Sequence, residues 1–136
     1  FNTCLRGEYK MPEKKILIID DSEIILKLTQ ATLNKAGYKV FTTTSLVEFD
    51  KLIKETPPDL IIIDIKMPEI QGDQICQVLR KDMTTSHIPI VFFSSLKDEE
   101  LKVLAEKSGA DGYISKEHGL DELAEMIEQV VNGILW

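Results

Sequence analysis

Four short apolar runs, rich in β-branched residues, constrain the fold of this chain more than any other feature. The runs cover residues 16–19, 60–63, 90–93 and 113–114, and a stretch with helical periodicity follows each of them. Apolar runs that alternate with amphipathic stretches are typical of parallel strands that are buried on both faces and joined by crossover helices. The pattern therefore predicts an α/β fold.

Turn and capping signals divide the chain into five strand–helix units. Strands are predicted at residues 15–20, 38–42, 59–64, 90–94 and 111–115, and helices at residues 22–36, 45–55, 73–81, 97–108 and 120–131. Asp21 or Ser22 can cap the first helix, and Gly37 can end it. Five such units with right-handed crossovers predict a doubly wound three-layer sandwich.

Side-chain polarity predicts where several of these elements lie. The second strand is half polar and is expected near a sheet edge, whereas the third is the most hydrophobic and is expected at the centre. Cys76 on the third helix is expected to be a small core residue. A core-facing stripe with three-and-four spacing is predicted in the last helix, formed by Leu120, Leu123, Ile127 and Val130.

The length of 136 residues fits a single domain, which we assign to residues 14–132. Residues 1–10 lack periodicity, and residues 1–13 are interpreted as an N-terminal tail, a cloning remnant or the end of an upstream linker. Residues 133–136 are interpreted as a C-terminal stub. A net charge of −7 argues against direct binding to nucleic acid or to an anionic membrane. Cys4 and Cys76 show no pairing pattern, and no signal or membrane-spanning segment is recognisable, which favours a cytoplasmic location.

Polar side chains stand where the apolar runs stop. Asp20 and Asp21 follow the first run, Asp64 the second, Ser94 the third and Lys116 the fifth strand. Because such sheets bind ligands outside the carboxyl ends of their strands, these side chains are expected at one edge of the sheet. Three carboxylates at such short distances repel one another unless a cation lies between them, and a divalent metal ion is the simplest candidate.

Taken with their spacing, these residues resemble the receiver (CheY-like) domain of two-component response regulators over residues 14–131. The motifs are IDDS at 19–22, IIIDIKMP at 61–68 with Gly72 downstream, IPIVFFSS at 88–95 and GYISK at 112–116. The resemblance implies a flavodoxin-like three-layer sandwich in which a five-stranded parallel sheet of order 2-1-3-4-5 lies between five helices.

The resemblance also implies a function for the strand ends. Asp64 is expected to accept a phosphoryl group from a sensor histidine kinase or a phosphotransfer protein. Asp20, Asp21, Asp64 and the backbone carbonyl of Lys66 are expected to hold Mg²⁺, which prefers hard oxygen ligands. An aspartyl phosphate can form when charge is neutralised around the carboxylate, and the metal and Lys116 supply that neutralisation.

Phosphorylation is expected to change another surface of the domain, which a partner then recognises. The family's switch positions match Ser94, Lys116 and Tyr113, and the face that repacks comprises helix 97–108, strand 111–115 and the last helix. The expected partner is a downstream protein or an output domain. The chain is expected to catalyse only its own phosphorylation and dephosphorylation and not to act as an enzyme on another substrate. Lys66 and Leu96 occupy the positions that tune hydrolysis, and the apolar Leu96 predicts a long-lived phosphorylated state.

Other interpretations of these residues remain open. Glu117 stands where the family usually has a proline, often after a cis peptide, which mildly favours a phosphorylation-independent interaction module. A Mg²⁺-dependent phosphohydrolase is less favoured, because the second acid expected two residues after the nucleophile is replaced by Lys66. A flavin-binding protein is disfavoured because the acidic segment 20–23 would repel a phosphate group. His87 and His118 are interpreted as surface residues.

Overall fold

The structure, a computed structural model, describes residues 13–133, so Cys4 and nearly all of the predicted tail and stub lie outside the described residues. The strands are β1 (Lys15–Ile19), β2 (Lys39–Thr43), β3 (Leu60–Ile63), β4 (Ile90–Ser94) and β5 (Gly112–Ser115). The α-helices are α2 (Glu23–Lys35), α3 (Leu46–Glu55), α4 (Gly72–Lys81), α5 (Asp98–Ser108) and α6 (Leu120–Val131). A short 3-10 helix that was not predicted, η1 (Lys116–His118), joins β5 to α6.

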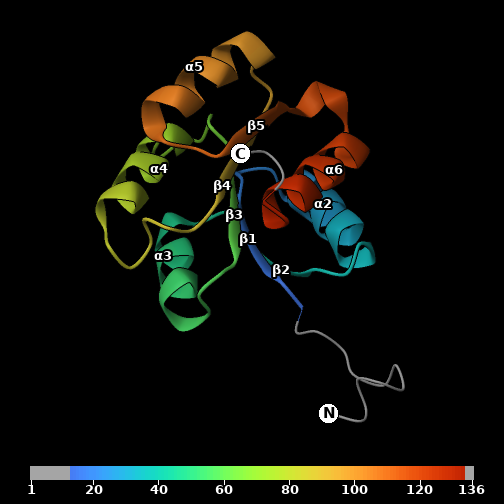
Figure 1. Ribbon diagram of the computed structural model, residues 1–136, viewed down its shortest axis with the longest axis horizontal. Coiled ribbons are helices and arrows are strands. Elements are labelled where there is room, and N and C mark those ends of the chain that lie inside the picture. Colours follow the sequence, from blue (N-terminus) through green and yellow to red (C-terminus); the bar gives the residue numbers. More distant parts are fainter. Residues whose placement is uncertain (1–12, 134–136) are drawn as a thin grey trace.

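The five strands form one parallel sheet in the order β2-β1-β3-β4-β5, which confirms the predicted fold class. The half-polar β2 lies at an edge and the apolar β3 lies at the centre, both as expected. Helices α3, α4 and α5 cover one face of the sheet, and α2 and α6 cover the other (Figure 1). No helix within residues 13–133 is long and apolar enough to cross a bilayer.

The central strand β3 explains why the runs are apolar without interruption. Ile61 and Ile63 pack into the core on the α3–α4–α5 side, whereas Leu60 and Ile62 pack into the core on the α2–α6 side. Successive side chains of a strand point to opposite faces, so both positions of the alternation are buried here. Burial of each such side chain contributes about 1.5–3 kcal/mol to folding.

The helix ends agree with the turn signals in the sequence. Ser22 caps α2, because its Oγ accepts a hydrogen bond from the Ile25 N–H at 3.3 Å. This result decides between the two predicted caps and leaves the exposed Asp21 side chain available for the site. Gly37 follows the helix with φ of +101°, a left-handed conformation that side chains rarely adopt.

The last helix and Cys76 also lie as predicted. Leu123, Ile127 and Val130 are buried in the α2–α6 core, with Leu120 half-buried at the start of the helix. Cys76 on α4 is fully buried, and its thiol lies 3.4 Å from the carbonyl oxygen of Ser108, to which it donates. Burial raises the pKa of this thiol to about 11, so Cys76 is a core residue with an unreactive sulfur.

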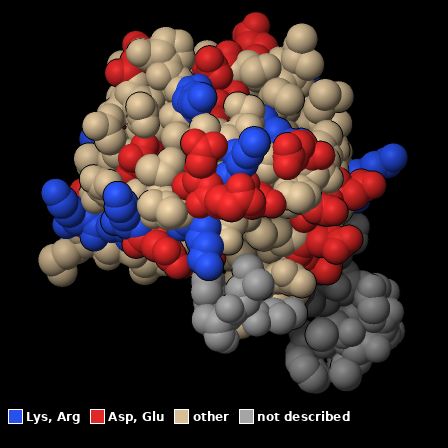
Figure 2. All heavy atoms as spheres, turned by 90° about the horizontal axis from the view of Figure 1, so that it is seen from above, with Lys and Arg blue, Asp and Glu red and all other residues tan. Residues whose placement is uncertain are grey.

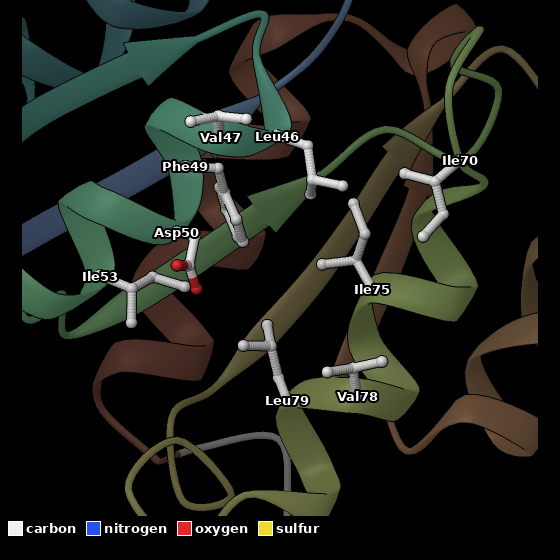
Figure 3. Close-up of a pocket in the computed structure, with 9 residues that line it drawn as sticks. All are labelled: Leu46, Val47, Phe49, Asp50, Ile53, Ile70, Ile75, Val78 and Leu79. Atoms are coloured by element: carbon white, nitrogen blue, oxygen red, sulfur yellow. The ribbon is translucent and has the colours of Figure 1, made fainter.

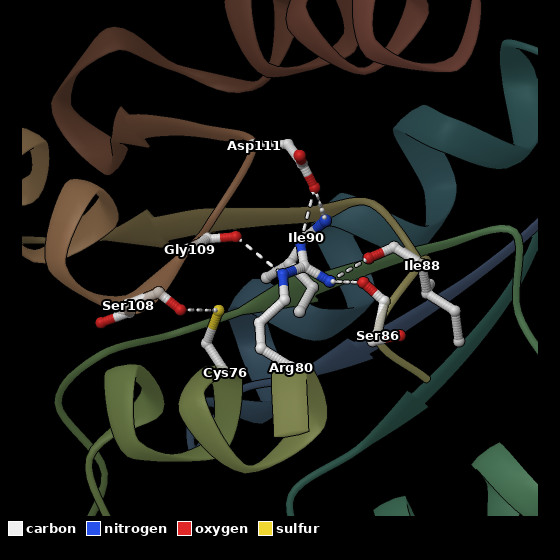
Figure 4. Close-up of polar contacts among 8 residues, drawn as sticks. All are labelled: Cys76, Arg80, Ser86, Ile88, Ile90, Ser108, Gly109 and Asp111. Atoms are coloured by element: carbon white, nitrogen blue, oxygen red, sulfur yellow. Dashed lines mark hydrogen bonds and ion pairs between the residues drawn. The ribbon is translucent and has the colours of Figure 1, made fainter. Parts of the chain in front are cut away.

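Arg80, near the end of α4, connects three segments at the amino end of β4 (Figure 4). Its guanidinium donates to the carbonyl oxygens of Gly109 at 2.8 Å, Ser86 at 3.1 Å and Ile88 at 2.7 Å. It also pairs with Asp111 at 2.7 Å. The sequence pattern did not single out Arg80, because its partners lie outside helices and strands, and Gly109 and Asp111 are about thirty residues further along the chain.

Candidate functional site

The carboxyl ends of four parallel strands bring the polar residues together. Asp20 directly follows β1, Asp64 follows β3, and Ser94 is the last residue of β4. Lys116 follows β5 at the start of η1. The Asp64 N–H donates to the carbonyl oxygen of Ile19 at 3.0 Å, which holds the ends of β1 and β3 side by side.

Three carboxylates form a tight group at this edge, here called the carboxylate cluster (Asp20, Asp21 and Asp64). One carboxylate oxygen from each lies within 4.8 Å of the others. Asp20 is 2% and Asp64 4% exposed, whereas Asp21 is open to solvent. Seen from above, the molecule shows acidic side chains gathered together with basic side chains between and around them (Figure 2). Hard oxygen donors at this spacing can hold a divalent metal ion.

Lys116 provides a positive charge beside the carboxylate cluster. Its Nζ lies 2.8 Å from Oδ2 of Asp20 and 3.5 Å from Oδ2 of Asp64. The same ammonium lies 5.9 Å from the centre of the Phe93 ring, within the range of a cation–π contact. Lys116 therefore neutralises part of the negative charge on the two buried carboxylates.

Glu117, the departure from the family's proline, does not prevent this contact. The described residues contain no cis peptide bond, so the Lys116–Glu117 peptide is trans. The Glu117 N–H donates to the Ser115 Oγ at 3.4 Å, which starts the turn of η1. The hydroxyl of Ser115 and the η1 turn thus position Lys116 without a proline.

Burial and charge act strongly on Asp64. Its pKa is raised from 3.8 to about 6, first because burial disfavours the charged form and then because Asp20 is close. Lys116 and a hydrogen bond from Ser94 lower the pKa and oppose these effects. Asp64 is therefore mostly ionised at neutral pH, but at a cost in free energy that an added cation would reduce.

Two backbone contacts orient the acidic side chains. Oδ1 of Asp20 accepts a hydrogen bond from the Ser22 N–H at 2.9 Å, which leaves Oδ2 directed at Lys116. Gly72, the first residue of α4, packs against the Asp64 backbone so closely that a Cβ there would lie 2.0 Å from the Asp64 carbonyl oxygen. The Gly72 N–H donates to the carbonyl oxygen of Ile65 at 2.9 Å, which closes the loop after β3.

Among the remaining predicted residues, Ser94 contacts the carboxylate cluster through its hydrogen bond to Asp64. Ser94 is fully buried, and its Oγ accepts from the Leu96 N–H at 3.5 Å. Leu96 is half-buried and packs against the core, whereas Lys66 is exposed in the loop after Asp64. Tyr113 is half-buried on the edge strand β5 and lines a hollow of about 460 Å³ between α5 and α6.

Two surface features were not predicted from the sequence. His118 is exposed as expected, but its ring lies between the carboxylates of Asp98 and Glu122. An apolar groove of about 420 Å³ also lies between α3 and α4, whose side chains face each other across it (Figure 3). Its lining contains Asp50 but no residue of the carboxylate cluster, so the groove is separate from the site.

Comparison with known proteins identifies the family. A family model of the response regulator receiver domain matches residues 16–128. This chain belongs to the response regulator receiver domain family. The receiver is 31% identical over 117 residues to the polar-differentiation response regulator DivK of Brucella ovis, a match that covers 85% of this chain and 94% of DivK.

The receiver is also similar to longer proteins and to solved structures. It is 35% identical over 119 residues to the alkaline phosphatase synthesis transcriptional regulatory protein PhoP of Bacillus subtilis, covering 87% of this chain and 48% of PhoP. The chain spans about half the length of several such curated relatives. The chemotaxis response regulator CheY4 of Vibrio cholerae superposes with a TM-score of 0.80 at 27% identity, covering 88% of this chain and 99% of that structure.

Proposed function

We propose that this receiver accepts a phosphoryl group on Asp64 from a sensor histidine kinase or a phosphotransfer protein. The observation that supports this most directly is the placement of the Asp64 carboxylate beside Asp20, Asp21 and the ammonium of Lys116. Membership of the receiver family supports the same assignment.

In the proposed reaction, one carboxylate oxygen of Asp64 attacks the phosphorus atom of a phosphohistidine. A P–O bond forms, the P–N bond breaks, and the imidazole of the donor leaves with the electron pair. Asp64 must be ionised to attack, and Lys116 favours the ionised form through its charge. Lys116 also lies where the ammonium can contact the added phosphoryl oxygens.

Mg²⁺ fits the donor set at this edge, since it prefers carboxylate, carbonyl and phosphate oxygens in octahedral geometry. We propose Asp20, Asp21, Asp64 and the backbone carbonyl of Lys66 as its protein ligands. When bound, the ion supplies positive charge that stabilises the transferring phosphoryl group. The chain's own residues orient this set, because Ser22 fixes Asp20 and Gly72 holds the Asp64 loop in place.

The phosphoryl group on Asp64 would then act on the α5–β5–α6 face. Ser94 is buried beside Asp64, so its hydroxyl can move to bind the new oxygens. We propose that this movement lets Tyr113 change its position and that a partner protein or an output domain detects the altered face. Such a change is a local charge event that biases an element with two arrangements.

Autodephosphorylation is proposed as the only other reaction of this domain. Leu96 and Lys66 would tune its rate, since both lie close in sequence to the switch and acceptor residues. Leu96 is apolar and half-buried, so it cannot orient an attacking water molecule. We therefore propose a phosphorylated state that persists longer than in receivers with an acid or an amide at this position.

The decisive experiment is to incubate the protein with Mg²⁺ and a small acyl-phosphate donor and to measure intact mass. We expect one added phosphoryl group, which should not form when Mg²⁺ is chelated before the donor is added and should be absent from Asp64→Asn. Asp59→Asn, which changes an exposed acid before β3, is the matched control and should be phosphorylated normally. Labelling of Asp64→Asn at the rate of the parent protein would contradict the proposal.

A further inference from the structure

His118 lies where three elements of the α5–β5–α6 face meet. Its Nε2 contacts Oδ2 of Asp98 at the start of α5, and its Nδ1 lies 3.3 Å from Oε2 of Glu122 on α6. His118 itself is the last residue of η1, directly after β5. These three residues are here called the His118 cluster (Asp98, His118 and Glu122).

The chemistry of the ring makes this arrangement depend on a proton. Both partners are carboxylates and can only accept, whereas a neutral imidazole carries a single N–H. Only the protonated ring donates to Asp98 and Glu122 together. The hydrogen bond from His118 to Asp98 is the largest cause of the raised pKa of the histidine. Loss of solvation opposes it, and the charges of Asp98, Glu122 and Glu117 raise the pKa further.

The His118 cluster is connected to the proposed phosphorylation site through the end of β5. Oδ1 of Asp98 accepts a hydrogen bond from the Ser115 N–H at 3.3 Å. Ser115 is followed directly by Lys116, which contacts Asp20 and Asp64. One residue, Ser115, therefore connects Lys116 to Asp98, the partner of His118.

The His118 cluster lies on the α5–β5–α6 face, which is proposed to change on phosphorylation. The hollow of about 460 Å³ is lined by all three residues of the cluster and by the side chain of Tyr113. Asp111, the other acid lining this hollow, is paired with Arg80 at 2.7 Å. Glu117, beside His118 in η1, is exposed and adds only negative charge near the ring.

We propose that His118 is a proton-dependent regulator of this receiver, which when protonated ties α5 and α6 to the end of β5 and opposes the rearrangement of that face. The inference has two halves. The ion-pair half, that the protonated ring pairs with Asp98 and Glu122, does not depend on the proposed function. The regulatory half, that this pairing opposes the rearrangement of the face, rests on it. Because the ring is held most firmly in its protonated form, the restraint is complete below pH 6.5 and weakens as the pH rises through the raised pKa of His118.

If protonation of His118 opposes the rearrangement, thermodynamic linkage requires the rearrangement to disfavour protonation of His118. If phosphorylation moves α5 or α6 away from His118, the protonated ring loses a partner, and its pKa must fall. The His118, Asp98 and Glu122 side chains are 35%, 42% and 57% exposed, so solvent weakens each ion pair. A residue-specific measurement is therefore needed to detect the effect.

The first experiment is an NMR titration of the histidine rings in the complete chain, with exposed His87 as an internal reference. We expect the pKa of His118 to fall in Asp98→Asn and to fall less in Glu122→Gln. Glu125→Gln, an exposed acid on the same helix outside the His118 cluster, should leave the titration of His118 unchanged. An unchanged His118 titration in Asp98→Asn would overturn the ion-pair half of the inference.

The second experiment repeats the titration with Mg²⁺ and beryllium fluoride, an analogue of the aspartyl phosphate, whose binding is followed independently by fluorine NMR. We expect the pKa of His118 to fall when the analogue binds, and to do so in the parent but not in Asp64→Asn. Bound analogue with an unchanged His118 titration would overturn the regulatory half alone. A parent protein that binds no analogue would contradict the proposed function, while the first experiment still decides the ion-pair half.

Discussion

Gly72 is a single residue on which the shape of the proposed phosphorylation site depends. A Cβ at this position would lie 2.0 Å from the carbonyl oxygen of Asp64 and 2.6 Å from the Cγ2 of Ile63. Both neighbours belong to the central strand and its end, so they cannot move without displacing Asp64. We predict that Gly72→Ala destabilises the fold by about 1–3 kcal/mol, as overpacking typically does, and slows phosphorylation of Asp64.

Denaturant unfolding and acyl-phosphate labelling of Gly72→Ala would test this prediction. Gln71→Ala is a suitable control, because Gln71 is exposed and makes no side-chain capping hydrogen bond to α4. A Gly72→Ala protein that unfolds and labels like the Gln71→Ala control would show that the loop can accept the extra methyl group.

Leu96 is the residue at which we expect the lifetime of the phosphorylated state to be set. An acid introduced there can orient a water molecule towards the phosphorus atom, whereas the leucine cannot. We predict that Leu96→Glu shortens the lifetime several-fold, measured as the loss of label from purified phosphorylated protein. Leu96→Met, which keeps an apolar side chain of similar volume, should decay like the parent. Equal decay of the parent and Leu96→Glu would contradict the prediction.

At the scale of whole elements, Arg80 joins α4 to the segments around β4. Its guanidinium donates to three carbonyl oxygens and pairs with Asp111, which in turn accepts from the Ile90 N–H at 2.8 Å. Removal of the guanidinium takes a donor from the carbonyl oxygen of Ile88 and from Asp111 at part-buried positions, whereas the acceptors of Gly109 and Ser86 are exposed to water. We predict that Arg80→Ala lowers the free energy of unfolding by about 2–4 kcal/mol, measured by urea denaturation.

Two further variants separate geometry from charge at this position. Arg80→Lys keeps the charge but lacks the planar fork, so it should recover less than half of the lost stability. Lys54→Ala breaks an exposed ion pair with Asp50 at 3.0 Å and should change stability by less than about 0.5 kcal/mol. Full recovery by Arg80→Lys would mean that charge alone accounts for the effect.

At the scale of the whole molecule, the buried carboxylates predict how stability depends on pH. The pKa of Asp64 is raised from 3.8 to about 6, so the folded state holds this proton over a range in which the unfolded state has released it. Stability therefore falls as the pH rises from 3.8 to 6, by on the order of 2–3 kcal/mol, and stays lower above that range. The His118 contribution is lost at higher pH and has the same sign.

Asp64→Asn tests this assignment without assuming phosphorylation. We predict that, in the absence of divalent metal, this variant is more stable than the parent at neutral pH and that the difference disappears below pH 3.8. Mg²⁺ should stabilise the parent through binding to the folded state and stabilise Asp64→Asn less. If the two proteins have the same unfolding free energy at neutral pH, burial of Asp64 does not carry the predicted cost.

Local patterns were sufficient to predict the five strands and five α-helices along the chain, whereas the full order of the strands in the sheet came from the resemblance to the receiver family. Uninterrupted apolar runs predicted a sheet buried on both faces, because both sides of β3 and β4 are covered by helices. Differences in polarity placed β2 at an edge and β3 at the centre. The same patterns led to the carboxylate cluster, since the carboxyl ends of parallel strands must lie at one edge of the sheet.

The sequence by itself determined the α/β sandwich, the strand that ends at Asp64 and the types of side chain at that edge. Only the tertiary structure decided the contacts between segments distant in the chain: the reach of Lys116 to Asp20, the contacts of Arg80 with Gly109 and Asp111, and the contact of His118 with Asp98. The physical reason is that backbone and burial preferences act over a few residues. Distances between side chains, in contrast, depend on how whole helices pack across the sheet.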